Sequence, residues 1–241
     1  MTDQGLFKFI QITLNNSQLE SIDILNLSAG VTVDSVWKLK NLPNLKSMAL
    51  NFRQLKLSEE DSLERNRSIR NLRLYSPWDY ESINSILQTV SEMFPKVSSL
   101  VLQNRIIGQQ ELPNWEHSMR SFECQIGKSS DLNNVFAIFP ELNNFRTSVP
   151  NPMFFSELFE VPSTLNIRRL ELFIGSDLFR DQTPDCNSVN IWMSRFPGNV
   201  EFKLSVKSNS EEMWQRFSFD LNSLRVPRMP IEIEHLGSNE D

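Results

Sequence analysis

Apolar residues recur along the chain in a short pattern: one apolar residue, two variable residues, a second apolar residue, one variable residue and a third apolar residue. Successive side chains of a strand point to opposite faces of a sheet, so each copy predicts a short strand with one buried face. Seven copies fit, one of them with Thr147 at its third position, and a looser eighth copy lies at residues 202–204. The middle apolar residues, which we call markers, are Ile22, Met48, Leu72, Leu100, Phe122, Phe145, Leu170 and Phe202.

The markers recur at a repeat spacing. Successive markers are 22 to 32 residues apart, and most steps lie in the range of about 20 to 29 residues that is typical of leucine-rich repeats. Alternate copies follow a proline, which cannot continue a helix and so predicts a helix that ends just before the strand. These prolines are Pro43, Pro95, Pro140 and Pro197, and the copies between them carry Arg70, Arg120 and Arg168. The chain therefore repeats in pairs of units.

The segments between the strands favour helices. Residues 79–93 place Ile83, Leu87 and Val90 at helical spacing. Weaker candidates are residues 132–139, 152–159, 187–196 (capped by Asn187 or Ser188) and 210–217, while 33–40 and 58–66 are long enough only for single turns. One strand and one helix cannot bury their own apolar faces, so the units must stack. The expected fold is an α/β solenoid with a parallel sheet on the concave side and helices on the convex side.

The domain boundaries follow from the repeats. Residues 1–14 are a candidate N-terminal capping strand, residues 15–206 form a solenoid of about eight irregular repeats, and residues 207–241 form a C-terminal cap and a solvated acidic tail that includes Glu232 and Glu234. The first repeat begins close to Met1, and solenoids need polar caps at their ends. Two explanations stay open: residues 1–14 are that cap, or the chain as given is truncated at its start.

Composition excludes several function classes. The 241 residues carry a formal net charge of −6 and include only 7 glycines, 2 cysteines and 2 histidines. Few glycines disfavour phosphate-binding loops, the acidic balance disfavours nucleic acid, and the Cys and His content is too low for a zinc cluster. No secretory signal or membrane-spanning run is evident. We therefore expect a cytoplasmic or nuclear protein without a metal, a cofactor or a membrane partner.

Candidate chemistry is sparse. The string Gly127-Lys128-Ser129 is similar to the end of a phosphate loop, but the position that needs a further glycine holds Phe122. Cys124 occupies a core position of its repeat, whereas Cys186 lies in the predicted loop 183–186, a position that is compatible with exposure. His117 and His235 have no nucleophile or carboxylate at a recognisable spacing. We expect no enzyme, with a loop-formed active site as the least favoured alternative.

The residues that alternate with the apolar ones should face the concave side, where charges of both signs balance. Such a wall suits a protein partner, because arginine and aromatic residues often anchor protein interfaces. The alternative for each residue is a merely solvated sheet position. The candidate partner-binding residues are Arg73, Tyr75, Gln103, Glu123, Arg146, Arg169, Glu171 and Phe173.

The strand pattern, with Leu-Pro or Phe-Pro before segments such as LPNLKSMAL (42–50) and FPKVSSLVL (94–102), resembles the irregular leucine-rich repeat region of F-box proteins over residues 15–206. This resemblance implies substrate recruitment to a cullin-based ubiquitin ligase, with an adaptor held by a separate F-box. No F-box pattern is present, so adaptor binding would need an F-box outside this chain. The expected function is a non-catalytic protein–protein interaction module, either the substrate-recognition region of an F-box-like ubiquitin ligase receptor or a free-standing leucine-rich-repeat interaction protein unrelated to ubiquitin.

Overall fold

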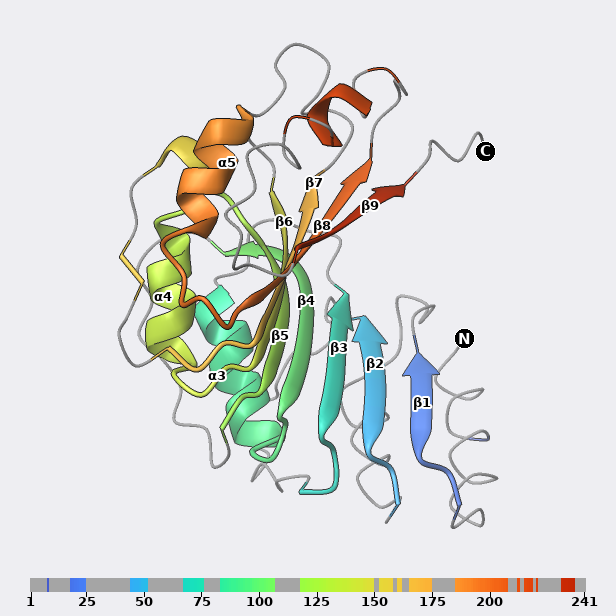
Figure 1. The fold of residues 1–241 in the computed structure, drawn as a ribbon. Helices are drawn as coiled ribbons and strands as arrows, with labels where there is room; N and C mark the ends of the chain where they lie inside the picture. The colour runs from blue at the N-terminus through green and yellow to red at the C-terminus, as the bar shows by residue number, and fades with distance from the viewer. Residues whose placement is uncertain are drawn as a thin grey trace. The chain divides into compact units, whose positions relative to one another are not determined.

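A computed structural model shows an α/β protein made of parallel strands and helices (Figure 1). It forms two compact units, residues 1–104 with 111–119 and residues 105–110 with 120–241, and each is described by itself. The structure describes residues 8, 18–24, 44–51, 67–75, 83–106, 118–149, 152–157, 160–161, 165–174, 185–207, 212, 215–218, 220 and 231–236.

The first unit contains the strands β1 (Ser21–Ile24), β2 (Ser47–Asn51) and β3 (Asn71–Tyr75), the helix α3 (Ile83–Met93) and residues 99–104 of the strand β4 (Ser99–Ile106). The strands pair in sequence order and in parallel, and the four markers pair directly with one another. The marker side chains are buried, as are Leu87, Val90 and Met93 of α3. The predicted strands and the helix before Phe94-Pro95 are therefore confirmed in this unit.

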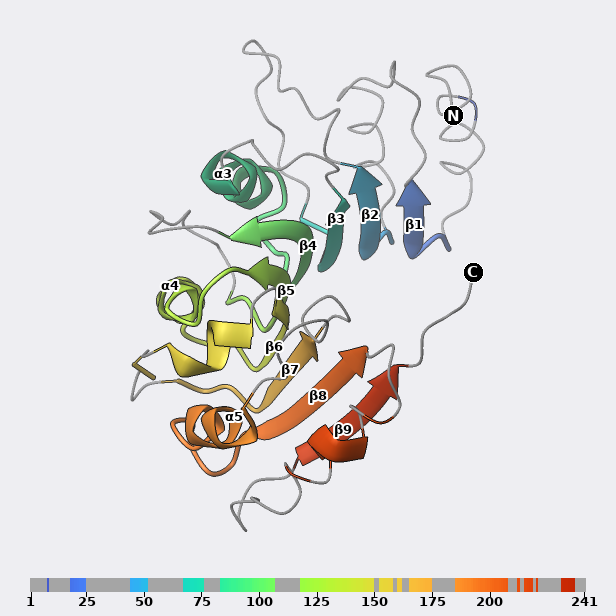
Figure 2. The ribbon, with the colours of Figure 1, turned by 90° about the horizontal axis from the view of Figure 1, so that it is seen from above.

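The second unit contains the strands β5 (Ser121–Ile126), β6 (Asn144–Val149), β7 (Arg169–Ile174), β8 (Glu201–Lys207) and β9 (Ile231–Leu236), all parallel and paired in sequence order. Its helices are α4 (Asp131–Ile138), the 3₁₀ helix η3 (Pro152–Ser156) and α5 (Cys186–Met193). Seen from above, these three helices follow one another along one face of the strands (Figure 2). The remaining four markers again pair directly across β5 to β8.

Several strands begin with the same backbone arrangement. The carbonyl of Glu20, just before β1, accepts hydrogen bonds from the amides of Lys46 and Ser47, at 2.8 and 3.0 Å. The carbonyls that precede β2, β3, β5 and β6, those of Lys46, Arg70, Arg120 and Asn143, each accept two amides in the same way. Because only backbone atoms take part, this strand entry does not depend on the side chain at that position.

Aromatic rings fill the core of the second unit. The Trp192 side chain in α5 is 0% exposed. Its ring centroid lies 5.0 Å from that of Phe196, 5.5 Å from those of Phe154 and Phe155, and 6.5 Å from that of Phe202. A further group of rings, Phe122, Phe136, Phe139 and Phe145, joins α4 to β5 and β6. Phenylalanine therefore occupies core positions, including markers, as the repeat pattern predicts.

The start of α5 differs from the prediction. Asp185, and not Asn187 or Ser188, is the N-cap, and its carboxylate accepts the amides of Asn187 and Ser188 at 3.2 and 3.1 Å. The carboxylate also accepts the Ser188 hydroxyl, and this hydrogen bond is the main cause of the lowered pKa of Asp185. Cys186 is consequently the first helical residue and is buried, so the predicted loop position is wrong.

Other expectations have mixed outcomes. The helix expected at 152–159 is the short η3, and residues 212 and 215–217 of the expected helix at 210–217 are helical. The segments 33–40 and 58–66 and nearly all of the candidate capping strand at 1–14 lie outside the described residues. No described helix has the length and hydropathy needed to span a membrane.

Candidate protein-binding face

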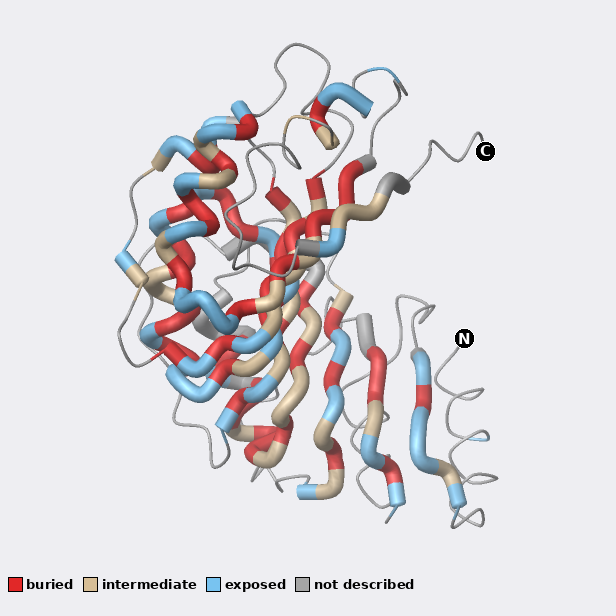
Figure 3. Tube along the Cα trace, in the orientation of Figure 1, coloured by how far each residue is buried: buried red, intermediate tan, exposed pale blue. Residues whose placement is uncertain are grey.

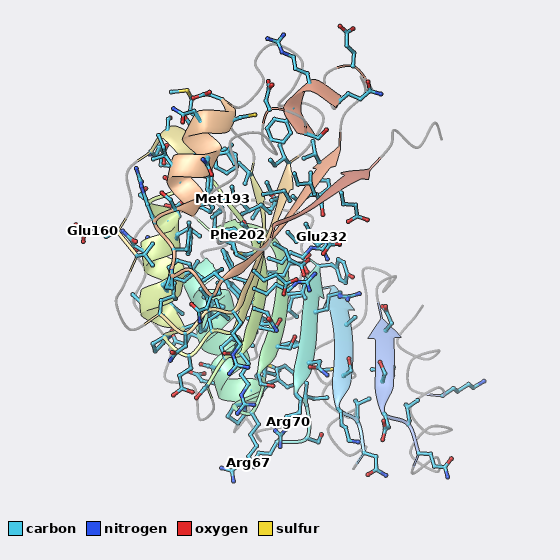
Figure 4. All side chains as sticks on the ribbon, in the orientation of Figure 1. Arg67, Arg70, Glu160, Met193, Phe202 and Glu232 are labelled. Carbon is cyan, nitrogen blue, oxygen red and sulfur yellow. The ribbon has the colours of Figure 1, made fainter. Side chains whose placement is uncertain are left out.

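Burial alternates along the strands of the second unit. In β6 and β7 every second side chain is buried, and the side chains between are half-buried or exposed (Figure 3). Met193 and Phe202 lie on the helix side of these strands, and Glu232 lies on the opposite side (Figure 4). We call that opposite side the open face of the second unit.

Charges of alternating sign cross the open face in one line. In β5 to β8 the residue after each marker pairs directly with its equivalent on the next strand, and Glu232 of β9 continues this line. We call it the charge ladder: Glu123, Arg146, Glu171, Lys203 and Glu232. Adjacent strands are about 4.8 Å apart, so each charge faces an opposite charge on its neighbour. The Arg146 guanidinium lies 3.7 Å from the Glu123 carboxylate and 3.8 Å from that of Glu171.

Arg169 connects the charge ladder to Glu201, a charged residue outside it. Its guanidinium lies 2.8 Å from the Glu171 carboxylate, 3.2 Å from Glu201 and 3.7 Å from Glu232. With Glu234, which contacts Lys203, these residues and the ladder form what we call the charged network. Its eight side chains comprise five carboxylates and three cations, which leaves a net charge of −2 when all are ionised.

Lys203 joins the last two carboxylates. Its ammonium lies 3.0 Å from Glu234 and 3.2 Å from Glu232. Hydrogen bonds to Glu234 and then Glu232 raise the pKa of Lys203, and the hydrogen bond from Lys203 is the main cause of the lowered pKa of Glu234. The Ser205 hydroxyl also donates to Glu234, at 3.3 Å. Each side chain thus has a defined position although it remains accessible to water.

We expect the contribution of the charged network to stability to be constant at intermediate pH and to be lost at both low and high pH. The contribution of Glu234, whose pKa is lowered by folding, is present above its unfolded pKa of about 4.3 and is lost as the pH falls through the folded value. The contribution of Lys203, whose pKa is raised, is present below about 10.4 and is lost as the pH rises through its folded value. The thermal midpoint of the wild type minus that of Lys203→Gln should therefore be largest between about pH 5 and 10. A difference that stays constant from pH 3 to 12 would contradict this linkage.

An aromatic side chain borders the network. Phe173 of β7 is half-buried and pairs directly with Ser148 and Ser205 on the neighbouring strands. Both of these neighbours have short side chains, and Ser205 in turn pairs with Glu234 of β9. The open face therefore combines fixed charges with an apolar surface, which is the composition of a protein interface.

The open side of the first unit has a different character. Ser21, Ser47, Asn71 and Ser99 form one line across β1 to β4, and the next line contains Asp23, Ala49, Arg73 and Val101. These short side chains leave a hollow of about 260 Å³ in which Arg73 is the longest lining side chain. Arg73 is exposed and Tyr75 is half-buried, while the side chain of Gln103, a residue of β4, lies outside the described set.

The structure brings half of the predicted partner-binding residues into direct contact. Glu123, Arg146, Arg169 and Glu171 belong to one network, and Phe173 lies on the same face. Arg73 and Tyr75 belong to the first unit.

Sequence analysis missed the last strand. Glu232 and Glu234 lie in β9 and pair with cations, so the expected solvated tail is wrong for these two residues. The repeat pattern fails there because its first apolar position holds Arg228. The alternation Ile231-Glu232-Ile233-Glu234 was the available signal, since a strict period of two is typical of a strand with one buried face.

The string Gly127-Lys128-Ser129 is already satisfied within the protein. The Ser129 amide donates to the Glu157 carboxylate at 2.9 Å, and the Lys128 amide donates to that of Asp131 at 3.1 Å. These two carboxylates occupy the amides that a phosphate would need ahead of α4. The structure therefore agrees with the expectation that this string is no phosphate loop.

Both thiols should be inert in the folded protein. Burial, with help from nearby carboxylates, raises the pKa of Cys124 well above its ordinary value, and burial raises the pKa of Cys186 to about 11. The thiolate is the reactive form, so iodoacetamide at pH 8 should label neither cysteine in the folded chain and both after unfolding in guanidinium chloride. Mass spectrometry of the intact protein would count the labels. Labelling of Cys186 at the unfolded rate without denaturant would contradict its burial.

Among the described residues, no group of three or more His, Cys, Asp and Glu side chains is arranged to hold a metal ion. Comparison of the chain with protein-family models, with curated proteins and with solved structures gives no match.

Proposed function

We propose that this protein is a non-catalytic protein-binding module and that the open face of the second unit is its principal binding surface. The observation that carries the proposal is the charged network. Its side chains are 20 to 53% exposed, yet each is held by ion pairs on adjacent parallel strands. A pre-ordered pattern of charges lowers the entropic cost of binding and selects partners by electrostatic complementarity.

The sign pattern favours a protein over a polyanion. Nucleic acids require clustered cations, whereas here each cation faces carboxylates and the network carries excess negative charge. A protein surface can present both signs in register with the ladder. Phe173 adds the apolar contact that such interfaces bury at their centres.

Arg146 is the best single test of this surface. Its side chain is 53% exposed and its ion pairs, at 3.7 and 3.8 Å, are the loosest of those formed by the ladder cations. Arg146→Gln should weaken partner binding about fivefold or more, the usual effect of removing an interface arginine worth over 1 kcal/mol. Stability should change by less than about 1 kcal/mol, because exposed ion pairs contribute little.

The matched control is Arg168→Gln, an exposed arginine just before β7 and outside the network. Proteins that co-purify with the wild-type chain from cells would be quantified by mass spectrometry, and the leading one would be titrated as a purified pair by calorimetry. Equal affinity for Arg146→Gln and Arg168→Gln would overturn the assignment of the open face.

Within the protein-binding class, the repeat pattern and its resemblance to F-box proteins favour substrate recognition for a ubiquitin ligase. The alternative is a free-standing interaction protein. Mapping the 5′ end of the transcript that encodes Met1 separates the two. An in-frame upstream F-box, with co-purification of a cullin adaptor by the longer product, would support the first, and a transcript that starts at Met1 would favour the second.

A further inference from the structure

The outer edge of β9 is a hydrogen-bonding edge of the second unit. β9 pairs with β8 on one side, and no described strand pairs with its other side. The backbone amides and carbonyls of an edge strand can pair with an added strand. Such an edge becomes a binding site only if its side chains select what pairs with it.

The charge ladder ends at this edge with an acidic residue, Glu232. Arg146, Glu171 and Lys203 each have an oppositely charged neighbour in register on both sides. Among the described residues, Glu232 has such a neighbour only on the β8 side, Lys203. Glu234 pairs in register with the uncharged Ser205, and its ion pair is with Lys203, also of β8. Continuing the alternation requires a basic residue opposite each of the two glutamates.

On the helix side of the β9 edge, an added strand would be favoured by an apolar residue. The buried line that contains Leu172 and Leu204, which are 1% and 0% exposed, continues to Ile233 of β9. Ile233 is only half-buried. An apolar side chain on an added strand would cover it and extend the core by one position.

We propose that the β9 edge binds an extended segment of a partner polypeptide in which two basic residues flank one apolar residue. The basic residues pair with Glu232 and Glu234, and the apolar residue between them packs beside Ile233. This site is on the edge of the sheet and goes beyond the proposed function, which concerns the open face. It shares with that proposal only the premise that the partner is a polypeptide.

A second copy of this chain fits the edge poorly. Pairing β9 with β9 would bring glutamates towards glutamates, and like charges on adjacent strands destabilise a sheet. The edge strand β1 offers Ser21 and Asp23 in the corresponding alternate positions and so supplies no cation. Charge complementarity therefore points to a different, basic segment.

The test uses blocked eight-residue peptides and the full chain. One peptide alternates lysine with valine, a second alternates glutamate with valine, and two more repeat the lysine peptide with N-methyl groups on either set of alternate residues. Fluorescence anisotropy of labelled peptides should show binding of the lysine peptide, about 5- to 30-fold weaker binding of the glutamate peptide, and loss of binding for at least one N-methylated peptide. Binding that ignores the charge, or that survives both N-methylations, would overturn the proposal.

Charge exchange provides a second test. The variant Glu232→Lys with Glu234→Lys should prefer the glutamate peptide, while Glu141→Lys, the same change at an exposed glutamate outside the charged network, should keep the lysine preference. If the double variant does not fold, the peptide series on the wild type still decides.

Sedimentation of the wild-type protein tests whether a second copy of the chain occupies the β9 edge. Self-association of the wild type that is lost in the double variant would overturn the proposal of a basic segment. Failure of the peptides together with a positive Arg146→Gln result would remove the edge site and leave the proposed open face intact.

Discussion

Replacing Leu172 with glutamate is expected to lower the free energy of unfolding by more than about 4 kcal/mol, a large part of the stability of about 5 to 15 kcal/mol that domains have. Leu172 is buried in β7 between Thr147 and Leu204 on the neighbouring strands. A glutamate there would lose its hydration among buried neighbours, and the buried leucine contacts would be lost as well.

The adjacent residue provides the matched control. Glu171 is on the open face, so Glu171→Leu should cost less than about 1 kcal/mol, because only exposed ion pairs are removed. Both variants would be compared by guanidinium unfolding followed by circular dichroism. A shift of one residue in register exchanges the two faces of a strand. Equal effects, or a larger effect at Glu171, would contradict the strand register.

Truncating Trp192 to alanine is the second large change, with an expected loss of about 3 to 5 kcal/mol. The ring contacts Phe154 and Phe155 of η3 and Phe196 after α5, and it reaches Phe202 of β8. Removing it therefore opens a cavity where two helices and the sheet meet. Aromatic pairs add about 0.5 to 1.5 kcal/mol each beyond the area that they bury.

Two controls separate the cavity from the loss of helix propensity. Trp192→Phe keeps an aromatic ring and should lose less than half as much stability, and Ile191→Ala changes a half-exposed neighbour in the same helix and should cost less than about 1 kcal/mol. Urea unfolding monitored by circular dichroism measures all three. A loss of under 1 kcal/mol for Trp192→Ala would show that α5 does not pack on the strands as described.

The repeat pattern predicted the strands well because it rests on burial. Every marker lies in a strand and pairs with the next marker within its unit, so spacing alone located β1 to β8. The Phe-Pro pairs likewise placed the ends of α3, α4 and α5, since proline excludes a further helical turn. Both signals are local and need no knowledge of distant contacts.

The parts that sequence analysis missed depend on contacts between elements. The pattern could not find β9, because Arg228 stands at its first apolar position and the pairing of β9 with β8 is a contact that a local pattern does not contain. The burial of Cys186 depends on the Asp185 cap and on the Phe217 carbonyl, which accepts its thiol hydrogen at 3.7 Å. The eight predicted binding residues included half of the charged network, but its alternation became visible only with the register of neighbouring strands.

The alternation of the charge ladder also restricts how the gene for this protein can gain or lose repeats. Deleting one inner strand, such as the one that carries Arg146, would place Glu123 beside Glu171. Deleting two successive strands, those of Arg146 and Glu171, would place Glu123 beside Lys203 and restore the attraction. In-frame duplications or deletions in this part of the chain are therefore tolerated best in steps of two repeats.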